Sequence, residues 1–237
     1  MSKTKYVNPV KTPFLVFSTK CHLWGEDALK LALAADAAAA ETGISLYFAV
    51  QAPDLRLIKE HTKHIIVTAQ HMDPLPIGRG CGWQLPEALK AAGADAVFLN
   101  HAEHPMTLTD LGKAIARAKE LKMHSIVCAD SVTEALAIAA FQPDILLCEP
   151  TDLIGTCQAA DNSYIERCVE VLRKEAPDAK IMIASGITTG EDVYNVIIHG
   201  ADGTGTTTGV VKAPDPGLRL QEMARAAAQA HKDLQVK

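Results

Sequence analysis

The residue that most suggests chemistry in this sequence is a glutamate, Glu149, at the end of a short apolar run. The run 145–148 reads ILLC, which is typical of a buried strand, and Pro150 directly after the glutamate ends that strand. The segment 151–157 that follows is loop-like and contains a Gly-Thr pair. A strand that ends on one acid beneath a loop can present a general base, although such an acid can also do no more than mark the strand end. Only other residues of the chain that could act together with Glu149 can distinguish these two interpretations.

Short apolar runs alternate with longer helical patterns along the whole chain of 237 residues. The runs predict strands at 14–18, 44–50, 64–69, 94–99, 125–129, 145–148, 180–184 and 203–207. Helices are predicted at 26–41, 55–60, 86–92, 107–121, 132–141, 164–175, 191–199 and 221–231. Strands that are each followed by a helix indicate a parallel sheet with both faces covered, in the α/β class.

The number of strands and the length of the chain favour a closed (β/α)8 barrel, formed by residues 1–237 as a single domain. An open doubly wound sheet is the alternative, but its first strand would lead into a glycine-rich fingerprint. Here the first strand ends in Ser18-Thr19-Lys20 instead. We therefore expect the barrel.

Side chains that follow the predicted strands would gather at one rim, because the active sites of such barrels lie at the C-terminal ends of the strands. The residues at these ends are Lys20, Asn100, His101, Glu103, Cys128, Glu149, Gly186, Thr207, Thr208 and Gly209. The set contains an amine, an imidazole and two carboxylates, and its glycine- and threonine-rich turns lead into helices. Such turns, together with Gly155, offer backbone N–H groups to an anion such as a phosphate. Each residue alone has an ordinary structural explanation, but the expected location of all of them on one rim favours an active site.

The composition of the chain limits which binding partners and which cellular compartment we expect. A formal net charge of −5 and the lack of a basic run argue against a nucleic acid and against an anionic membrane surface. No apolar run approaches the ~18 residues of a membrane span, and residues 1–14 lack the apolar stretch of a signal peptide, so we expect a cytoplasmic protein. The six cysteines are scattered without a CxxC pair, which fits reduced thiols. A metal site is a weak interpretation of His101, Glu103 and His104, because Pro105 follows and no other rim histidine offers a ligand.

Several motifs resemble those of the triosephosphate isomerase family, especially its short archaeal-type form. LNHAE at 99–103 resembles the family's LNHSE, and CEP at 148–150 with LIGT at 153–156 resembles its catalytic-glutamate strand and closing loop. SGITTGEDV at 185–193 and GVVKAPDP at 209–216 follow in the family's order. The resemblance covers nearly the whole chain. It implies a TIM barrel that isomerises a short sugar phosphate with no metal and no organic cofactor.

The resemblance also implies a role for each rim residue. Glu149 would be the base that removes a proton beside a carbonyl, and His101 the electrophile that shuttles a proton between the two oxygens of an enediolate. Lys20 would be the cation near the developing oxyanion, with Glu103 as a carboxylate behind these groups. The substrate-binding residues would be Ser18, Gly155, Gly186, Thr207 and Thr208, the last four as the anion cradle. The substrates would be glyceraldehyde 3-phosphate and dihydroxyacetone phosphate.

Departures from the family pattern keep alternatives open. The family reads Asn-x-Lys where this chain has Ser18-Thr19-Lys20, and a second register would place Ser18 on the lysine position. The smaller Ser18 could leave room for another hydroxymethyl group, so an isomerase of a phosphorylated tetrulose such as erythrulose phosphate is one alternative. Ser18, Ala102 and Cys157 also suit a catalytically inactive sugar-phosphate-binding relative. A lyase that uses Lys20 as a Schiff-base amine is a further alternative.

The family resemblance also implies a homodimer or a homotetramer. The long segment 71–84, which is rich in glycine and proline, is the candidate to reach into a neighbouring subunit, as the equivalent loop does in the family. Connections of this length inside a compact domain are usually functional.

Overall fold

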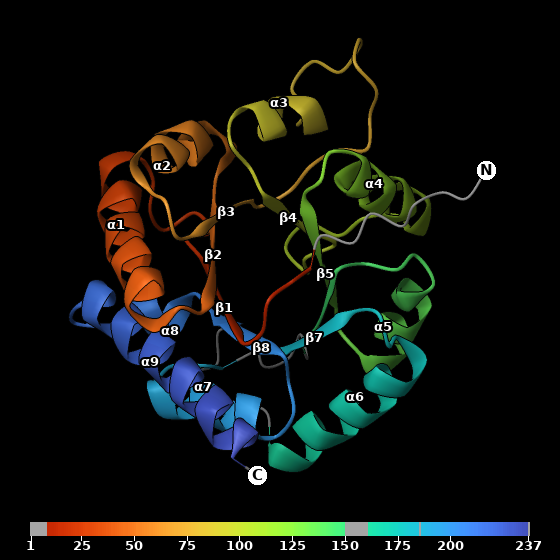
Figure 1. The fold of residues 1–237 in the computed structure, drawn as a ribbon. Helices are drawn as coiled ribbons and strands as arrows, with labels where there is room; N and C mark the ends of the chain where they lie inside the picture. Colours follow the sequence, from red (N-terminus) through yellow and green to blue (C-terminus); the bar gives the residue numbers. More distant parts are fainter. Residues whose placement is uncertain (1–8, 150–160, 185, 237) are drawn as a thin grey trace.

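The computed structural model describes residues 9–149, 161–184 and 186–236 of the chain. Within them, parallel strands close into a barrel in which each strand lies beside the next one along the chain. The strands are β1 (Phe14–Ser18), β2 (Ser45–Val50), β3 (Ile66–Ala69), β4 (Ala96–Leu99), β5 (His124–Ala129), β6 (Ile145–Cys148), β7 (Lys180–Ile183) and β8 (Gly203–Thr206). The last strand pairs with the first, with Phe14 beside Gly203, and this pairing closes the sheet (Figure 1). The predicted (β/α)8 barrel is confirmed.

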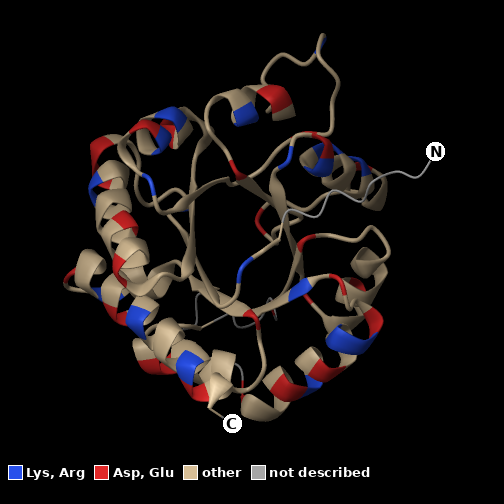
Figure 2. Ribbon diagram, viewed as in Figure 1, with Lys and Arg blue, Asp and Glu red and all other residues tan. Residues whose placement is uncertain are grey.

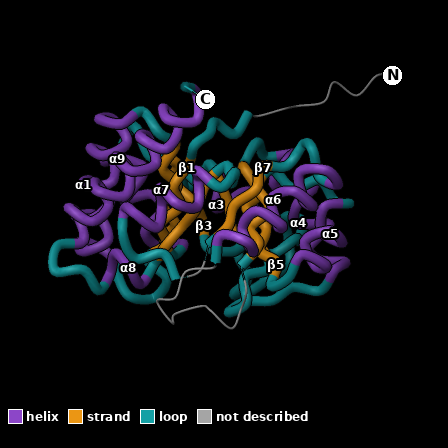
Figure 3. The backbone as a smooth tube through the Cα atoms, turned by 90° about the horizontal axis from the view of Figure 1, so that it is seen from below, coloured by secondary structure: helices purple, strands orange, loops and turns teal. Residues whose placement is uncertain are grey.

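Helices form a ring around the strands (Figure 1), and in the view turned by 90° they lie on either side of the strands (Figure 3). They are α1 (Gly25–Thr42), α2 (Leu55–His61), α3 (Pro86–Ala91), α4 (Leu108–Glu120), α5 (Val132–Ala139), α6 (Asn162–Glu175), α7 (Gly190–Ile198), α8 (Thr208–Val211) and α9 (Pro216–Gln235), with a 3₁₀ turn η1 (Ala52–Asp54). In the described part of the chain, no helix is both long and apolar enough to cross a membrane.

Two differences from the predicted helices lie near the C-terminal end. The last helix begins at Pro216 rather than at residue 221, because Asp215 caps it and accepts the N–H of Leu218 at 3.0 Å. Pro216 then fits the first helical turn, where a missing N–H does no harm. The short helix α8 was not predicted, since four residues are too few to show a helical period.

Alternate residues of each strand face the barrel interior and the surrounding helices. In β1, Phe14 and Val16 belong to the interior cluster, whereas Leu15 and Phe17 pack beneath the helices. Both sets are buried, which explains why most strands are continuous apolar runs rather than alternating patterns. Charged residues lie mainly on the outer helices and loops (Figure 2).

The glycines of β8 are an exception to the apolar pattern, and they are required by close packing against β1. A Cβ added to Gly203 would collide with the ring and the carbonyl oxygen of Phe14. One added to Gly205 would lie 2.9 Å from the carbonyl oxygen of Val16. The two glycines therefore allow the last strand to approach the first closely enough to complete the barrel.

The last helix covers the place where the barrel closes. α9 packs against α1, α7 and β1 (Figure 1). Tyr194 of α7 donates its hydroxyl to Asp233 at 2.9 Å, and Arg225 forms an ion pair with Glu41 of α1 at 2.7 Å. These contacts tie α9 to the helices on both sides of it.

Candidate active site

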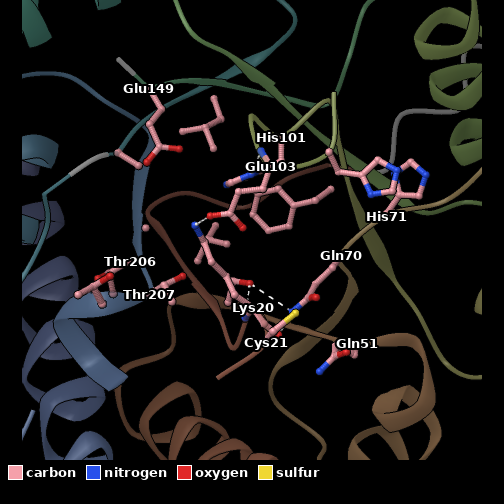
Figure 4. A pocket seen from close by; sticks show the side chains of 18 of the residues that line it. Lys20, Cys21, Gln51, Gln70, His71, His101, Glu103, Glu149, Thr206 and Thr207 are labelled. Carbon is pink, nitrogen blue, oxygen red and sulfur yellow. Dashed lines mark hydrogen bonds and ion pairs between the residues drawn. The ribbon is translucent and has the colours of Figure 1, made fainter. Parts of the chain in front are cut away.

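A cavity of about 350 Å³ opens at the C-terminal ends of the strands. The residues predicted to carry chemistry all line it, and Figure 4 shows them together: Lys20, His101, Glu103 and Glu149. The predicted substrate-binding residues Ser18, Gly186, Thr207 and Thr208 line it as well. Gly155 lies outside the described residues. The structure thus brings the described catalytic and substrate-binding candidates into one cavity, whereas the predicted rim residues Asn100, Cys128 and Gly209 are not among those that line it.

Lys20 lies just beyond β1 and has an unusual backbone conformation. Its φ is 44°, in the left-handed region, which for a residue with a side chain costs about 1–2 kcal/mol. Its Nζ lies 2.6 Å from Oε1 of Glu103, and the lysine side chain is 23% exposed. Of the two registers considered for β1, the structure has Lys20 as the residue that reaches Glu103, with Ser18 as the last residue of the strand.

The imidazole of His101 accepts a hydrogen bond on one of its nitrogens. Nδ1 accepts the backbone N–H of Glu103 at 3.0 Å, which requires an unprotonated Nδ1 and places the proton of a neutral ring on Nε2. Burial lowers the pKa of His101 below its ordinary value of 6.5. The charge of Lys20 lowers this pKa further, against the opposing effect of Glu103. His101 is therefore a neutral donor near pH 7.

Glu149 continues the line of β6 by one residue. Its backbone N–H donates to the carbonyl oxygen of Ala129 at 2.9 Å, which fixes the start of its side chain against β5. Burial raises the pKa of the Glu149 carboxyl; the charge of Lys20 opposes the rise in part, and Glu103 adds to it. A carboxylate with a raised pKa is a stronger base, which suits proton abstraction.

Cys128, the rim residue of β5, is a neutral thiol rather than a nucleophile. It is buried, and burial raises the pKa of its thiol well above the ordinary value, with the charge of Glu149 adding to the rise. The thiolate is the reactive form of cysteine, so a group in this state is inert.

Asn100 holds the loop that carries His101 and Glu103. Its backbone is left-handed, with φ 57°, and its side-chain amide donates at 3.0 Å to both the carbonyl oxygen of Cys128 and Oε1 of Glu134. Its side-chain oxygen accepts the N–H of Met106 at 3.0 Å. The loop after β4 is therefore fastened to the neighbouring strand and to α5. Asn100 was predicted to lie on the rim, whereas no sequence motif marks Glu134.

The loop between β7 and α7 is braced from the last helix. Arg219 donates to the carbonyl oxygen of Thr188, and Oε1 of Glu222 accepts the N–H of Gly190 at 2.8 Å. The same two side chains pair with each other, Nε to Oε2, at 3.0 Å. Asp192 accepts the N–H of Thr188 at 2.8 Å from within α7. This network sets the shape of the loop, which presents Thr188 to the cavity.

The cavity is also lined by several polar residues that were not predicted from the sequence. They are Cys21, Gln51, Gln70, His71, Gln84 and His104. A signal for two of them was present, because Gln51 directly follows β2 and Gln70 directly follows β3. The rule that located the other rim residues, applied to these two strand ends, finds both glutamines.

The side chains weighed as metal ligands are engaged in other contacts. His104 stacks on His71, with ring centroids 3.8 Å apart and an angle of 18° between the planes. His101 and Glu103 take part in the contacts described above. Across the three described stretches of the chain, no group of three or more His, Cys, Asp or Glu side chains is arranged to hold a metal ion.

The fold and the rim together define a (β/α)8-barrel protein with a glutamate, a neutral histidine and a lysine at the C-terminal end of its strands. The family model described as triosephosphate isomerase matches residues 13–227. Triosephosphate isomerase from Methanothermus fervidus is 36% identical over 212 residues, which are 88% of this chain and 95% of that protein. The enzyme from Methanothermobacter thermautotrophicus is 35% identical over 217 residues, 90% of this chain and 94% of its own length.

A solved structure supports the fold. The crystal structure of triosephosphate isomerase from Bartonella henselae superimposes with a TM-score of 0.76 at 12% identity, over 91% of this chain and 99% of that one. The chain belongs to the triosephosphate isomerase family. The resemblance noted from the sequence motifs is confirmed.

Proposed function

We propose that this protein is a triosephosphate isomerase, which interconverts glyceraldehyde 3-phosphate and dihydroxyacetone phosphate. The observation that carries the proposal is the convergence of Glu149, a neutral His101 and Lys20 on one cavity. Membership of the family supports the same reaction. The isomerisation moves hydrogen between neighbouring atoms of one molecule, so it needs no external oxidant or reductant.

The proton steps follow from the chemistry of the three side chains. The Glu149 carboxylate removes the proton from the carbon beside the carbonyl, and the resulting enediolate carries negative charge on oxygen. The Nε2–H of His101 donates to that oxygen, and the ammonium of Lys20 stabilises its charge. His101 then transfers protons between the two oxygens, and Glu149 returns its proton to the neighbouring carbon.

The phosphate of the substrate is assigned to the side of the cavity formed by β7 and β8. Gly186, which has a left-handed φ of 69°, and the threonines 206–208 line that side. Thr206 donates its hydroxyl to the carbonyl oxygen of Ile187 at 2.7 Å, which ties the two turns together. Turns of this kind present backbone N–H groups to an anion.

A triose is favoured over a tetrulose as the substrate. The relatives compared above are named triosephosphate isomerase. The hydroxyl of Ser18, the residue that suggested a larger substrate, accepts the backbone N–H of Lys20 at 3.1 Å and so has a role within the turn. A phosphorylated tetrulose remains the comparison substrate for the assay.

A coupled isomerisation assay on purified protein tests the proposal. We expect rapid turnover of both triose phosphates, slower turnover of erythrulose phosphate, and exchange of one substrate proton with deuterated solvent. Replacing Glu149→Asp should reduce kcat severely without changing the circular dichroism spectrum. A wild-type protein that binds dihydroxyacetone phosphate without turnover or exchange would instead be an inactive binding relative. A preference for erythrulose phosphate would reassign the substrate.

The assembly and the compartment belong to the same proposal. The loop 71–84 projects beyond the ring of helices beside α3 (Figure 1). It carries two exposed apolar side chains, Ile77 and Trp83. Exposed apolar groups on a projecting loop suit contact with a second copy of the chain, as a homodimer or homotetramer. Sedimentation of the Ile77→Ser, Trp83→Ser double variant should reveal a smaller species than the wild type. The free thiols among the described cysteines fit a reducing cytoplasm.

A further inference from the structure

In the turn that carries Lys20, side chains of neighbouring residues form hydrogen bonds with both backbone polar groups of Lys20, its N–H and its carbonyl oxygen. The N–H of Lys20 donates to the hydroxyl oxygen of Ser18 at 3.1 Å. Its carbonyl oxygen accepts from the amide nitrogen of Gln70 at 3.0 Å and from the hydroxyl of Thr19 at 3.3 Å. A left-handed conformation in a residue other than glycine persists only when its surroundings hold it there.

Gln70 contacts all three residues of this turn from another part of the barrel. It follows β3, and its amide nitrogen lies 3.2 Å from the hydroxyl oxygen of Thr19 and 3.5 Å from that of Ser18, in addition to its bond with Lys20. Thr19 is fully buried, and its backbone N–H donates to Ala49 of β2 at 2.9 Å. Figure 4 shows the Gln70 amide beside the backbone of Lys20, while the lysine side chain extends away toward Glu103.

We infer that Gln70 and Ser18 are positioning residues, which clamp Lys20 in its left-handed conformation and thereby direct its ammonium to Glu103 and the cavity. The inference rests on the proposed function for the catalytic importance of Lys20, but not for the clamp itself. Without the Gln70 amide, the Lys20 carbonyl loses its partner from the residue after β3, and the backbone can relax toward an ordinary negative φ. Such a rotation redirects the side chain, because the direction of Cβ follows the backbone.

Displacement of Lys20 has an electrostatic signature that a purely structural role for Gln70 would not produce. The charge of Lys20 contributes to lowering the pKa of His101 and of Glu103. If the ammonium moves away, the pKa of His101 rises toward its ordinary value. This change is measurable by NMR titration, and it does not depend on turnover.

The test is the variant Gln70→Met, which keeps the length of the side chain and removes the amide. We expect a folded protein whose kcat falls at least tenfold, up to the ~10²–10³ typical of losing one charge-stabilising donor. KM should change less, and the pKa of His101 should rise. The matched control is Gln142→Met, at an exposed glutamine beyond α5, which should leave all three quantities unchanged.

A second pair of variants keeps the test decisive if Gln70→Met does not fold. Ser18→Ala removes the acceptor for the Lys20 N–H, whereas Ser18→Thr keeps a hydroxyl, so the His101 pKa should shift in the alanine variant and return to the wild-type value in the threonine variant. Folded Gln70→Met or Ser18→Ala proteins with wild-type His101 pKa and kcat would overturn the inference. A wild-type protein that is inactive on triose phosphates would overturn the proposed function instead. The His101 pKa measured by NMR would still test whether Gln70 and Ser18 position Lys20.

Discussion

The backbone N–H of Glu103 donates to Nδ1 of His101 at 3.0 Å, while the carboxylate of the same Glu103 pairs with Lys20 at 2.6 Å. One residue therefore sets the protonated nitrogen of the imidazole through its main chain and holds the ammonium through its side chain. The two groups proposed to stabilise the enediolate are fixed relative to each other by a single short turn.

Replacing Glu103→Gln separates these two functions. The backbone bond to His101 remains, but the carboxylate that raises the pKa of His101 and pairs with Lys20 is lost. We expect the pKa of His101 to fall further and kcat to drop about tenfold, less than the ~10²–10³ for loss of a whole donor. NMR titration and the coupled assay measure both effects. Glu170→Gln, at an exposed glutamate of α6, is the control, and an unchanged His101 pKa in Glu103→Gln would contradict the prediction.

The pH dependence of kcat/KM should show the raised pKa of Glu149. The base acts only when ionised, so activity is lost as pH falls through its pKa in the free enzyme. Burial raises that pKa, so the acid limb should lie above the ordinary glutamate value of 4.5. Because Lys20 lowers the pKa of Glu149, the residual activity of Lys20→Met should have its acid limb at still higher pH. An acid limb at or below 4.5 in the wild type would show that another group controls the profile.

The brace between α9 and the β7–α7 loop should affect substrate binding more than chemistry. Glu222→Ala removes the acceptor for the Gly190 N–H and the partner of Arg219. The loss of one such hydrogen bond should raise KM roughly three- to tenfold, with a smaller change in kcat. Steady-state kinetics of Arg225→Met, whose guanidinium pairs with Glu41 on the outer surface, provide the control. Equal effects of the two variants on KM would indicate a general disturbance of α9.

Closure of the barrel should be sensitive to one methyl group. Gly203→Ala places a Cβ against the ring and carbonyl oxygen of Phe14, so β1 or β8 must shift. We expect a loss of about 1–3 kcal/mol in the free energy of unfolding, typical of overpacking. Urea unfolding measures this as a lower midpoint at constant slope. Thr133→Ala, at an exposed position of α5, should change the midpoint little, and a Gly203→Ala midpoint equal to the wild-type value would refute the prediction.

Much of the fold was predictable because each strand is a distinct apolar run and each run is followed by a helical pattern. The rim residues could be predicted from the same pattern, because residues that follow a strand end, such as His101 and Glu149, line the cavity. The register of β1 could not be decided in this way. A shift of two residues between Ser18 and Lys20 keeps the same side chains facing inward, so the pattern fits both.

The supporting contacts were not predictable from the sequence. Glu222 reaches a loop more than thirty residues before it, and Gln70 reaches a turn fifty residues before it. Such pairs are set by how the strands and helices are arranged in the folded barrel rather than by local sequence. The strand-end rule identifies Gln70 as a rim residue, but not the backbone carbonyl that it binds.

The pairing of Phe14 with Gly203 has a consequence for biosynthesis. During synthesis β1 is completed early, but it gains its second neighbour in the sheet only when β8 has formed. Until then, the growing sheet has two unpaired edges, which are places where β-structures associate wrongly. Contacts between parts so distant in the chain also form slowly. We therefore expect nascent chains to be prone to aggregation until β8 pairs with β1 and closes the sheet.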